Sequence, residues 1–166
     1  MDKILKLPNE KIQLAKDSNT PQETLAILAT DENFYVRRCV AQNPNTPPEI
    51  LEVLATDGDW VVRSHVAQNP NTPSETLKVL VTDRNFNVRH WVARNPNTSP
   101  ESLATLATDK HWSVRCFVAE NPNTSQETLE ILATDKDFLV RCGVAQNPNA
   151  TEMIRRLVLM TNGQHS

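Results

Sequence analysis

The feature of this sequence that most constrains its fold is a stretch of 26 residues that recurs five times. The copy from Thr46 to Asn71 shows the frame: Thr-Pro-x-Glu, two leucine-type positions three residues apart, an aspartate, an aromatic residue, Val-Arg, Val-Ala and Asn-Pro-Asn. A fixed period of this length is typical of supersecondary units that bury their apolar faces against their neighbours. The chain is therefore expected to form a stack of repeats. The other copies begin at Thr20, Thr72, Thr98 and Thr124.

Each unit opens with the signals of a helix start. A threonine is followed three residues later by a glutamate, which is the spacing of a capping box, in which the hydroxyl accepts the N3 amide and the carboxylate bonds the threonine amide. Leucines three residues apart then share one face. We therefore predict a first helix of roughly 11 residues with threonine as its N-cap. The capping pairs would be Thr20 and Glu23, Thr46 and Glu49, Thr72 and Glu75, Thr98 and Glu101, and Thr124 and Glu127.

A second helix of roughly 10 residues is predicted from about Asn33 to Gln42 in the first unit. The proline of Asn43-Pro44 stops it, because proline cannot continue a helix. At 100° per residue, one broad face collects the positions that keep their residue type in every unit, apart from an alternation of Phe and Trp. In the first unit these positions are Phe34, Val36, Arg37, Val40 and Ala41.

One solenoid domain accounts for residues 1–166. Residues 1–18 are expected to form an N-terminal half-repeat cap, 19–148 the five repeats, and 149–166 a C-terminal capping helix and a short polar tail. In the N-terminal cap, Glu10 and Lys11 stand where the repeats have Val and Arg. Only three glycines and no low-complexity tract argue against flexible segments.

The overall composition excludes some classes of protein. The net charge of −3 and the pI of about 5.8 do not indicate binding to nucleic acid or to an anionic membrane. No apolar run approaches the 18 or so residues of a membrane span, and Met1–Leu14 lacks a signal-peptide core. Three cysteines without close pairing fit a reducing compartment, so a cytoplasmic location is expected.

The frame Val-Arg-x-x-Val-Ala-x-Asn-Pro-x-Thr-Pro-x-Glu, seen most fully in Val62–Glu75, resembles the leucine-rich repeat variant family of bacterial proteins. The match covers about residues 10–150. The resemblance implies an all-α, right-handed superhelical α-solenoid, similar in kind to HEAT and armadillo repeats, in which one helix of each unit can be 3₁₀. It implies binding rather than a defined activity. Some relatives hold an iron–sulfur centre with an N-terminal cysteine cluster, but Met1–Ser18 contains no cysteine, so no cofactor is expected.

The repeated arginine allows two interpretations. As a ladder of cations it would hold the phosphates of a nucleic acid. As a structural group within the apolar face, its guanidinium would bond Asp31-type carboxylates or the carbonyls of the Asn-Pro turns, within or between units, and such bidentate pairs would fix the register of the repeats. We favour the structural interpretation and keep nucleic-acid binding as the alternative function. The column consists of Arg37, Arg63, Arg89, Arg115 and Arg141.

Two other constant columns are interpreted as structural. The asparagines of the Asn-Pro-Asn turns, from Asn43 and Asn45 onward, are expected to bond turn backbones in the neighbouring unit. The aromatic residues at the first position of the second helix are expected to pack in the core and not to stack on bases. These residues are Phe34, Trp60, Phe86, Trp112 and Phe138.

The opposite face of the second helices varies between units, although the surrounding columns are constant. It carries aromatic, basic and sulfur-containing residues instead of the Lys, Glu, Gln and Ser of a solvated face, which indicates contact with a partner. We therefore predict a non-enzymatic scaffold that binds a protein or peptide here, with Trp91 and Phe117 as anchors. The sequence leaves open whether this face is concave or convex. The predicted partner-binding residues are Tyr35, Arg38, Cys39, His65, His90, Trp91, Arg94, Phe117 and Glu120.

Metal binding and catalysis find little support. His90, Cys116 and Cys142 share one column, but adjacent helices pack about 8–10 Å apart, which is too far for a common zinc ion with bonds of about 2.3 Å. His65 near Cys39 is too little for a nucleophile. No metal, cofactor or small-molecule substrate is expected.

Overall fold

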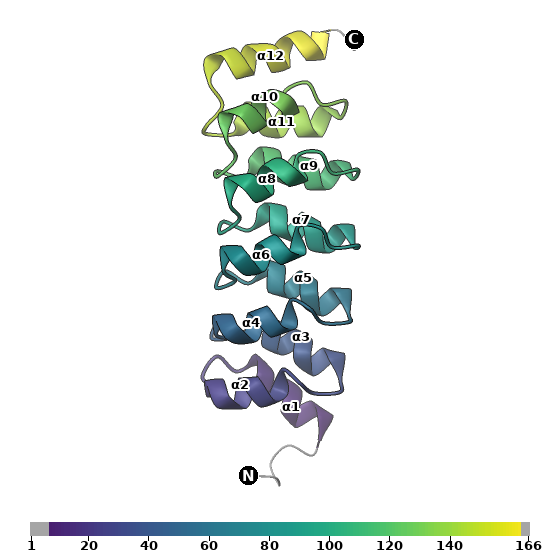
Figure 1. The fold of residues 1–166 in the computed structure, drawn as a ribbon, viewed down its shortest axis with the longest axis vertical. Helices are drawn as coiled ribbons and strands as arrows, with labels where there is room; N and C mark the ends of the chain where they lie inside the picture. Colours follow the sequence, from purple (N-terminus) through teal and green to yellow (C-terminus); the bar gives the residue numbers. More distant parts are fainter. Residues whose placement is uncertain (1–6, 164–166) are drawn as a thin grey trace.

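The structure, a computed structural model, describes residues 7–163. Within this range the chain forms twelve α-helices and no strand, so the predicted all-α solenoid is confirmed (Figure 1). Five helix pairs are flanked by a half-unit at each end. Residues 1–6 of the predicted cap and 164–166 of the predicted tail lie outside the described residues. The half-units are α1 (Pro8–Lys16) and α12 (Glu152–Gly163); the first helices are α2 (Gln22–Leu28), α4 (Pro48–Leu54), α6 (Ser74–Leu80), α8 (Pro100–Leu106) and α10 (Gln126–Leu132); the second helices are α3 (Phe34–Gln42), α5 (Trp60–Gln68), α7 (Phe86–Arg94), α9 (Trp112–Glu120) and α11 (Phe138–Gln146).

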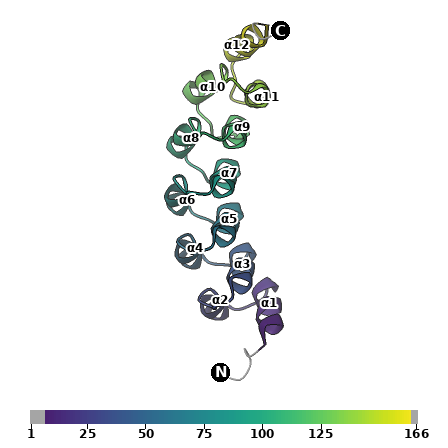
Figure 2. The same cartoon turned by 90° about the vertical axis from the view of Figure 1, so that its right-hand side faces the viewer.

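The first helices are shorter than predicted, with seven residues against nine in the second helices, and both kinds are α-helical. The two kinds form separate layers of a curved stack, and the layer of second helices lines the concave side (Figure 2). Close contacts along the stack are concentrated between successive second helices. Their closer spacing bends the stack towards them. The variable face of the second helices therefore lies on the concave surface.

The core lies between the two layers and is built from constant columns. The paired leucines of the first helices are at most 2% exposed, and the valines of the two constant columns in the second helices are fully buried. Full burial of one such side chain contributes about 1.5–3 kcal/mol. Each repeat therefore supplies the same four or five apolar residues to one continuous core. The leucines are Leu25, Leu28, Leu51, Leu54, Leu77, Leu80, Leu103, Leu106, Leu129 and Leu132.

The predicted role of the repeat threonines as N-caps is wrong. Each first helix has its N-cap one residue later, at Pro or Ser, and among these Ser99 and Ser125 accept the N3 amide. The threonine hydroxyl instead points back to the preceding second helix, as in the 2.6 Å bond from Thr72 Oγ1 to the Val66 carbonyl. The last carbonyls of a helix lack partners within the helix, and the buried hydroxyl satisfies one of them. Thr20, Thr46, Thr98 and Thr124 make the same bond.

The predicted core position of the aromatic column is also wrong. Phe34 is partly buried, but the rings at the other four positions are 38–56% exposed. These residues are the first of their helices, and a helical side chain leans towards the N-terminus of its helix. The ring therefore points away from the middle of its own helix and stays largely uncovered. The exposed rings belong to Trp60, Phe86, Trp112 and Phe138.

Candidate functional site

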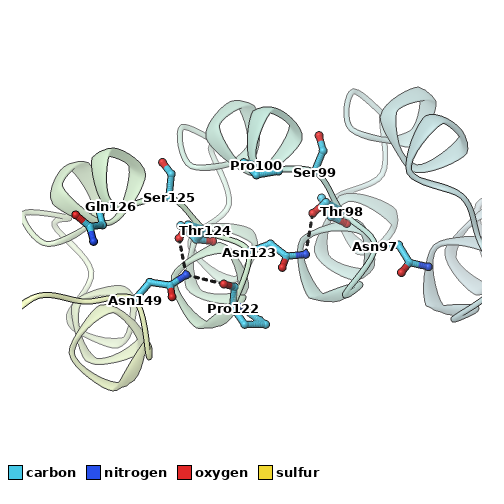
Figure 3. Close-up of a pocket in the computed structure, with 10 residues that line it drawn as sticks. All are labelled: Asn97, Thr98, Ser99, Pro100, Pro122, Asn123, Thr124, Ser125, Gln126 and Asn149. Carbon is cyan, nitrogen blue, oxygen red and sulfur yellow. Dashed lines mark hydrogen bonds between the residues drawn. The ribbon is translucent and has the colours of Figure 1, made fainter.

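The Asn-Pro-Asn turns run along one edge of the stack and bond to one another, as predicted. The first asparagine is buried, and Asn69 Nδ2 donates to the carbonyls of Ala41 (2.8 Å) and Asn43 (3.0 Å) in the preceding repeat. The second asparagine also bonds backward, so that Asn149 donates to Pro122 (2.6 Å) and Thr124 (Figure 3). The hollow of about 620 Å³ between these turns is lined by groups that hold the repeats together. It therefore belongs to the fold and not to a ligand site.

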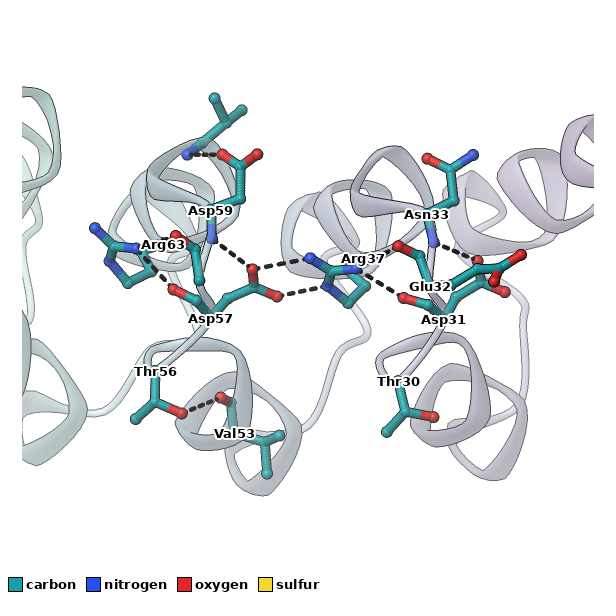
Figure 4. A network of polar contacts seen from close by, with 12 residues as sticks. Thr30, Asp31, Glu32, Asn33, Arg37, Val53, Thr56, Asp57, Asp59 and Arg63 are labelled. Carbon is teal, nitrogen blue, oxygen red and sulfur yellow. Dashed lines mark hydrogen bonds and ion pairs between the residues drawn. The ribbon is translucent and has the colours of Figure 1, made fainter.

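The arginine column forms a ladder of ion pairs along the other edge. Arg37 Nε lies 2.6 Å from Asp57 Oδ2, its Nη2 donates to Oδ1 at 3.0 Å, and its Nη1 donates to the Asp31 carbonyl at 2.8 Å (Figure 4). The bidentate pair joins each repeat to the next, so the structural interpretation of this column is confirmed. The carbonyl that each arginine bonds belongs to the loop before its own helix, however, and not to an Asn-Pro turn. The same pairs join Arg63 to Asp83, Arg89 to Asp109, and Arg115 to Asp135.

The series of arginine ion pairs and the series of asparagine bonds both continue into the terminal half-units, but with different residues. Lys11 takes the position of the arginine and lies 2.6 Å from Asp31. At the other end, Arg141 Nε donates to Asn162 Oδ1 at 2.6 Å, where an aspartate would stand in a further repeat. Arg155 replaces the turn asparagine and donates to the carbonyls of Ala145 and Asn147. The end helices thus satisfy the polar groups that the last full repeats expose.

The aspartates of the ladder are held as carboxylates. Burial raises the pKa of Asp109. The hydrogen bond from Arg89, the bond from the His111 amide and the positive charge of Arg89 together lower the pKa by more, so that its net shift is downward from 3.8. The carboxyl pKa is lowered in the same way at Asp57, Asp83 and Asp135, and at Asp31 by Lys11. The ladder is therefore fully charged near neutral pH.

These lowered pKa values predict a loss of stability in acid. A carboxyl with a folded pKa below its unfolded value stabilises the fold above the unfolded pKa, and this contribution is lost as the pH falls through the folded pKa. The contribution should therefore be constant between about pH 5 and 7 and fall steeply below about pH 4. Urea unfolding across pH 7 to 2 measures it. The variant Asp109→Asn should show a shallower acid dependence; an equally steep one would contradict this origin.

The concave face carries a cluster that joins four of the predicted site residues. The ring of His90 lies 4.3 Å from that of Phe117 and 5.2 Å from that of Trp91, with edge-to-face geometry in both cases. The guanidinium of Arg94 lies over both larger rings, 5.3 Å from Trp91 and 5.4 Å from Phe117. Burial, followed by the charge of Arg94, lowers the pKa of His90, so the imidazole is neutral near neutral pH. We call His90, Trp91, Arg94 and Phe117 the concave cluster.

The other predicted site residues lie outside this cluster. Tyr35 is 48% exposed and carries Arg38 over its ring at 5.3 Å. His65 lies 3.3 Å from Gln42 Nε2 and from Gln68, and Glu120 is exposed. Cys39 was expected on the partner-binding face, but it is only 1% exposed. The larger Trp91 at the equivalent position is only partly buried, so the small side chain of Cys39 belongs to the core.

The cysteines show no sign of chemistry. Burial and the carboxylate of Glu120 raise the pKa of Cys116 to about 12, so its thiol is protonated and a poor nucleophile. Cys39, Cys116 and Cys142 are free thiols. Among the described residues, no group of three or more His, Cys, Asp or Glu side chains is arranged to hold a metal ion. None of the described helices is both long and apolar enough to cross a membrane.

One further surface of the protein was not predicted from the sequence. The four exposed aromatic rings follow one another along the edge of the aspartate ladder, and each of the last three is preceded by a cation. A cation two residues before an aromatic residue that opens a helix was visible in the sequence as Arg84, Lys110 and Lys136. It was overlooked because the rings were assigned to the core.

The stacked helix pairs and the two bonded ladders define a helical repeat solenoid. Family models described as Leucine Rich Repeat Variant domain and Leucine rich repeat variant match residues 9–68 and residues 60–85, 86–111 and 112–137. The chain therefore belongs to the leucine-rich repeat variant family. A solved structure described as a leucine-rich repeat variant with a novel repetitive protein structural motif is similar, with 27% identity, a TM-score of 0.69, and coverage of 94% of this chain and 67% of that chain. No curated protein matches this sequence.

Proposed function

We propose that this protein is a non-enzymatic scaffold that binds a protein or peptide on the concave face of its second helices. The observation that carries the proposal is the concave cluster. Trp91 and Phe117 are partly buried against the core, while Arg94 is exposed above them. Trp and Arg are the residues most enriched among those that dominate binding energy, and they contribute most in well-packed central positions.

The curvature of the stack supports the same face. A solenoid presents an extended concave surface, and here the second helices line it (Figure 2). The variable residues from Tyr35 to Glu120 belong to these helices. The residues around the cluster differ between repeats, whereas those of the core and the two ladders do not. These differences between repeats would allow a partner to bind one particular stretch of the stack and not the others.

The alternative function, nucleic-acid binding through the arginine column, is less well supported. The guanidinium groups of Arg37, Arg63, Arg89 and Arg115 are bonded to carboxylates and carbonyls of the fold. A phosphate could take these donors only by displacing an aspartate and leaving its buried charge unpaired, which is costly.

Truncation of the cluster should abolish capture of the partner. We expect Trp91→Ala or Phe117→Ala to weaken binding by about 2 kcal/mol or more, which is roughly 30-fold. Affinity capture from an extract of the source cells compares these variants with the wild type, after circular dichroism has shown unchanged folding. The control is Val79→Ala, because Val79 is 60% exposed on the convex layer. Equal capture by the wild type and both cluster variants would contradict the proposal.

We also propose a cytoplasmic location. The support is that Cys39, Cys116 and Cys142 are all free, as expected for a reducing compartment. Fractionation of the source cells tests this location; recovery of the protein outside the cytoplasmic fraction would contradict it.

A further inference from the structure

Four exposed rings form a second surface, which we call the rim ladder: Trp60, Phe86, Trp112 and Phe138. They are 41%, 38%, 43% and 56% exposed, and each opens the second helix of its repeat. Between Phe86 and Trp112 the imidazole of His111 continues the aromatic surface, stacked on Phe86 at 4.0 Å. Large rings left in water at the same position of four successive repeats offer a regular apolar surface to an extended ligand.

Cations accompany three of the rings. Arg84, Lys110 and Lys136 are exposed in the loops just before Phe86, Trp112 and Phe138. The nearby carboxylates of Asp83, Asp109 and Asp135 are already bonded to the arginine ladder. The guanidinium of Arg84 reaches back to the Gly58 carbonyl of the preceding repeat at 3.4 Å. This segment of the edge thus has one ring and one exposed cation without a carboxylate partner per repeat, and at Lys136 the carboxylate of Asp137 stands next to the cation. It fits a partner with regularly placed negative charges, most closely at Arg84 and Lys110.

A hollow lies beside the ion pair of Arg89 and Asp109, between the third and fourth repeats. Its volume is about 430 Å³, and Arg84, Arg89 and Lys110 line it together with Asp83 and Asp109. Both aspartates are engaged, by Arg63 and Arg89 respectively, so Arg84 and Lys110 are the uncompensated charges at this hollow. It has room for one acidic side chain of a ligand that follows the ladder.

The spacing of the rings selects the conformation of the ligand. Successive second helices pack side by side, so equivalent rings repeat at about 8–10 Å, the distance between packed helices. A polyproline II helix advances about 9 Å in each turn of three residues. A β-strand instead returns to the same face after about 7 Å and would lose register within two repeats. Proline-rich segments are known to dock on aromatic surfaces in this conformation.

We propose that the rim ladder binds an acidic proline-rich segment in the polyproline II conformation, with one proline against each ring and one carboxylate beside each of Arg84, Lys110 and Lys136. The four rings span about ten residues of such a segment. The rim ladder adjoins the concave cluster, since Phe86 lies one helical turn before His90 in α7. Its rings are nevertheless different residues, so this inference does not rest on the proposed function.

A labelled peptide of four Pro-Pro-Glu triplets tests the proposal by fluorescence anisotropy. We expect it to bind the full chain saturably and more weakly as salt is raised, because the cations are exposed. A peptide of four Gly-Ser-Glu triplets keeps the charge spacing without the conformation, and one of four Pro-Pro-Lys triplets reverses the charge. Neither should bind. Failure of the first peptide to bind, or equal binding of either control peptide, would overturn the proposal.

Variants locate the site. Trp112→Ala should weaken binding of the Pro-Pro-Glu peptide at least tenfold, and so should Lys110→Glu, which changes an exposed side chain and leaves the fold intact. Val79→Ala and the concave-cluster variant Trp91→Ala should bind it like the wild type. An unchanged affinity in Lys110→Glu would overturn the assignment. Preferential binding of a single-stranded dT12 oligonucleotide, with stacking on the rings, would replace the peptide by nucleic acid and equally overturn it.

Discussion

Substitution of Arg89 by alanine should destabilise the protein by about 3–5 kcal/mol, because it leaves the buried carboxylate of Asp109 without its partner. Arg89 is 7% exposed, and it also donates to the Asp83 carbonyl at 2.6 Å. For a chain of this size each kcal/mol lowers the melting temperature by about 2–4 °C. Thermal unfolding followed by circular dichroism measures the loss. Any ligand affinity of the folded variant should be almost unchanged.

The neighbouring Arg84 provides the control for this substitution. It is exposed in the loop just before α7, so Arg84→Ala should change stability by no more than about 0.5 kcal/mol. The double variant Arg89→Met/Asp109→Leu should recover much of the loss, since replacing both members of a buried ion pair by apolar residues is often nearly neutral. If Arg89→Ala melts like the wild type and loses salt-dependent binding to nucleic acid in a gel-shift titration, the arginine column binds phosphate and the structural interpretation fails.

Asn95→Ala should have the next largest effect, a loss of about 2–4 kcal/mol. The Asn95 side chain is 3% exposed and donates to the carbonyls of Ala67 (2.7 Å) and Asn69 (3.1 Å). Its own oxygen accepts the Asn97 amide at 2.8 Å. Each buried polar group left without a partner costs about 1–3 kcal/mol. Urea denaturation of the variant measures the change, and we expect the midpoint of unfolding to shift to a lower urea concentration.

Substitution of the second asparagine of the same turn distinguishes the effect of burial from the effect of the number of hydrogen bonds. Asn97 also makes two side-chain bonds, to Pro70 and Thr72, but its side chain is exposed and water can replace it. Asn97→Ala is therefore expected to cost about 1 kcal/mol or less. Equal losses for the two variants would show that burial of the carbonyls is not the source of the stability.

The sequence predicted those parts of the structure that depend on period and charge pairing. The helix pairs followed from the 26-residue frame, and the aspartate partners of the arginine column were among those expected from its position in the apolar face. The concave cluster was also predictable in part, because Trp91 and Phe117 stand in a variable column among constant ones. Their contact with His90 and Arg94 required the distance between neighbouring helices.

Other features depend on geometry that the residue pattern does not contain. A threonine three residues before a glutamate fits a capping box, but burial of Thr72 against the preceding helix decides which carbonyl or amide it bonds. The aromatic column falls on the constant face of an ideal helix, yet Trp112 is 43% exposed, because the residue pattern does not say what covers the first residue of a helix. Cys39 and Trp91 occupy equivalent positions and differ in exposure because the smaller side chain does not reach the surface.

Site-specific photocrosslinking tests most directly the claim that the concave face binds the partner. A photoreactive phenylalanine analogue placed at position 117 lies in the concave cluster, and the same analogue at position 79 lies on the convex layer. After irradiation in the source cells, we predict a discrete crosslinked partner from position 117 that disappears when Trp91→Ala is added, and none from position 79. Crosslinking to the same partner from position 79 alone, or equally from both positions, would contradict the account.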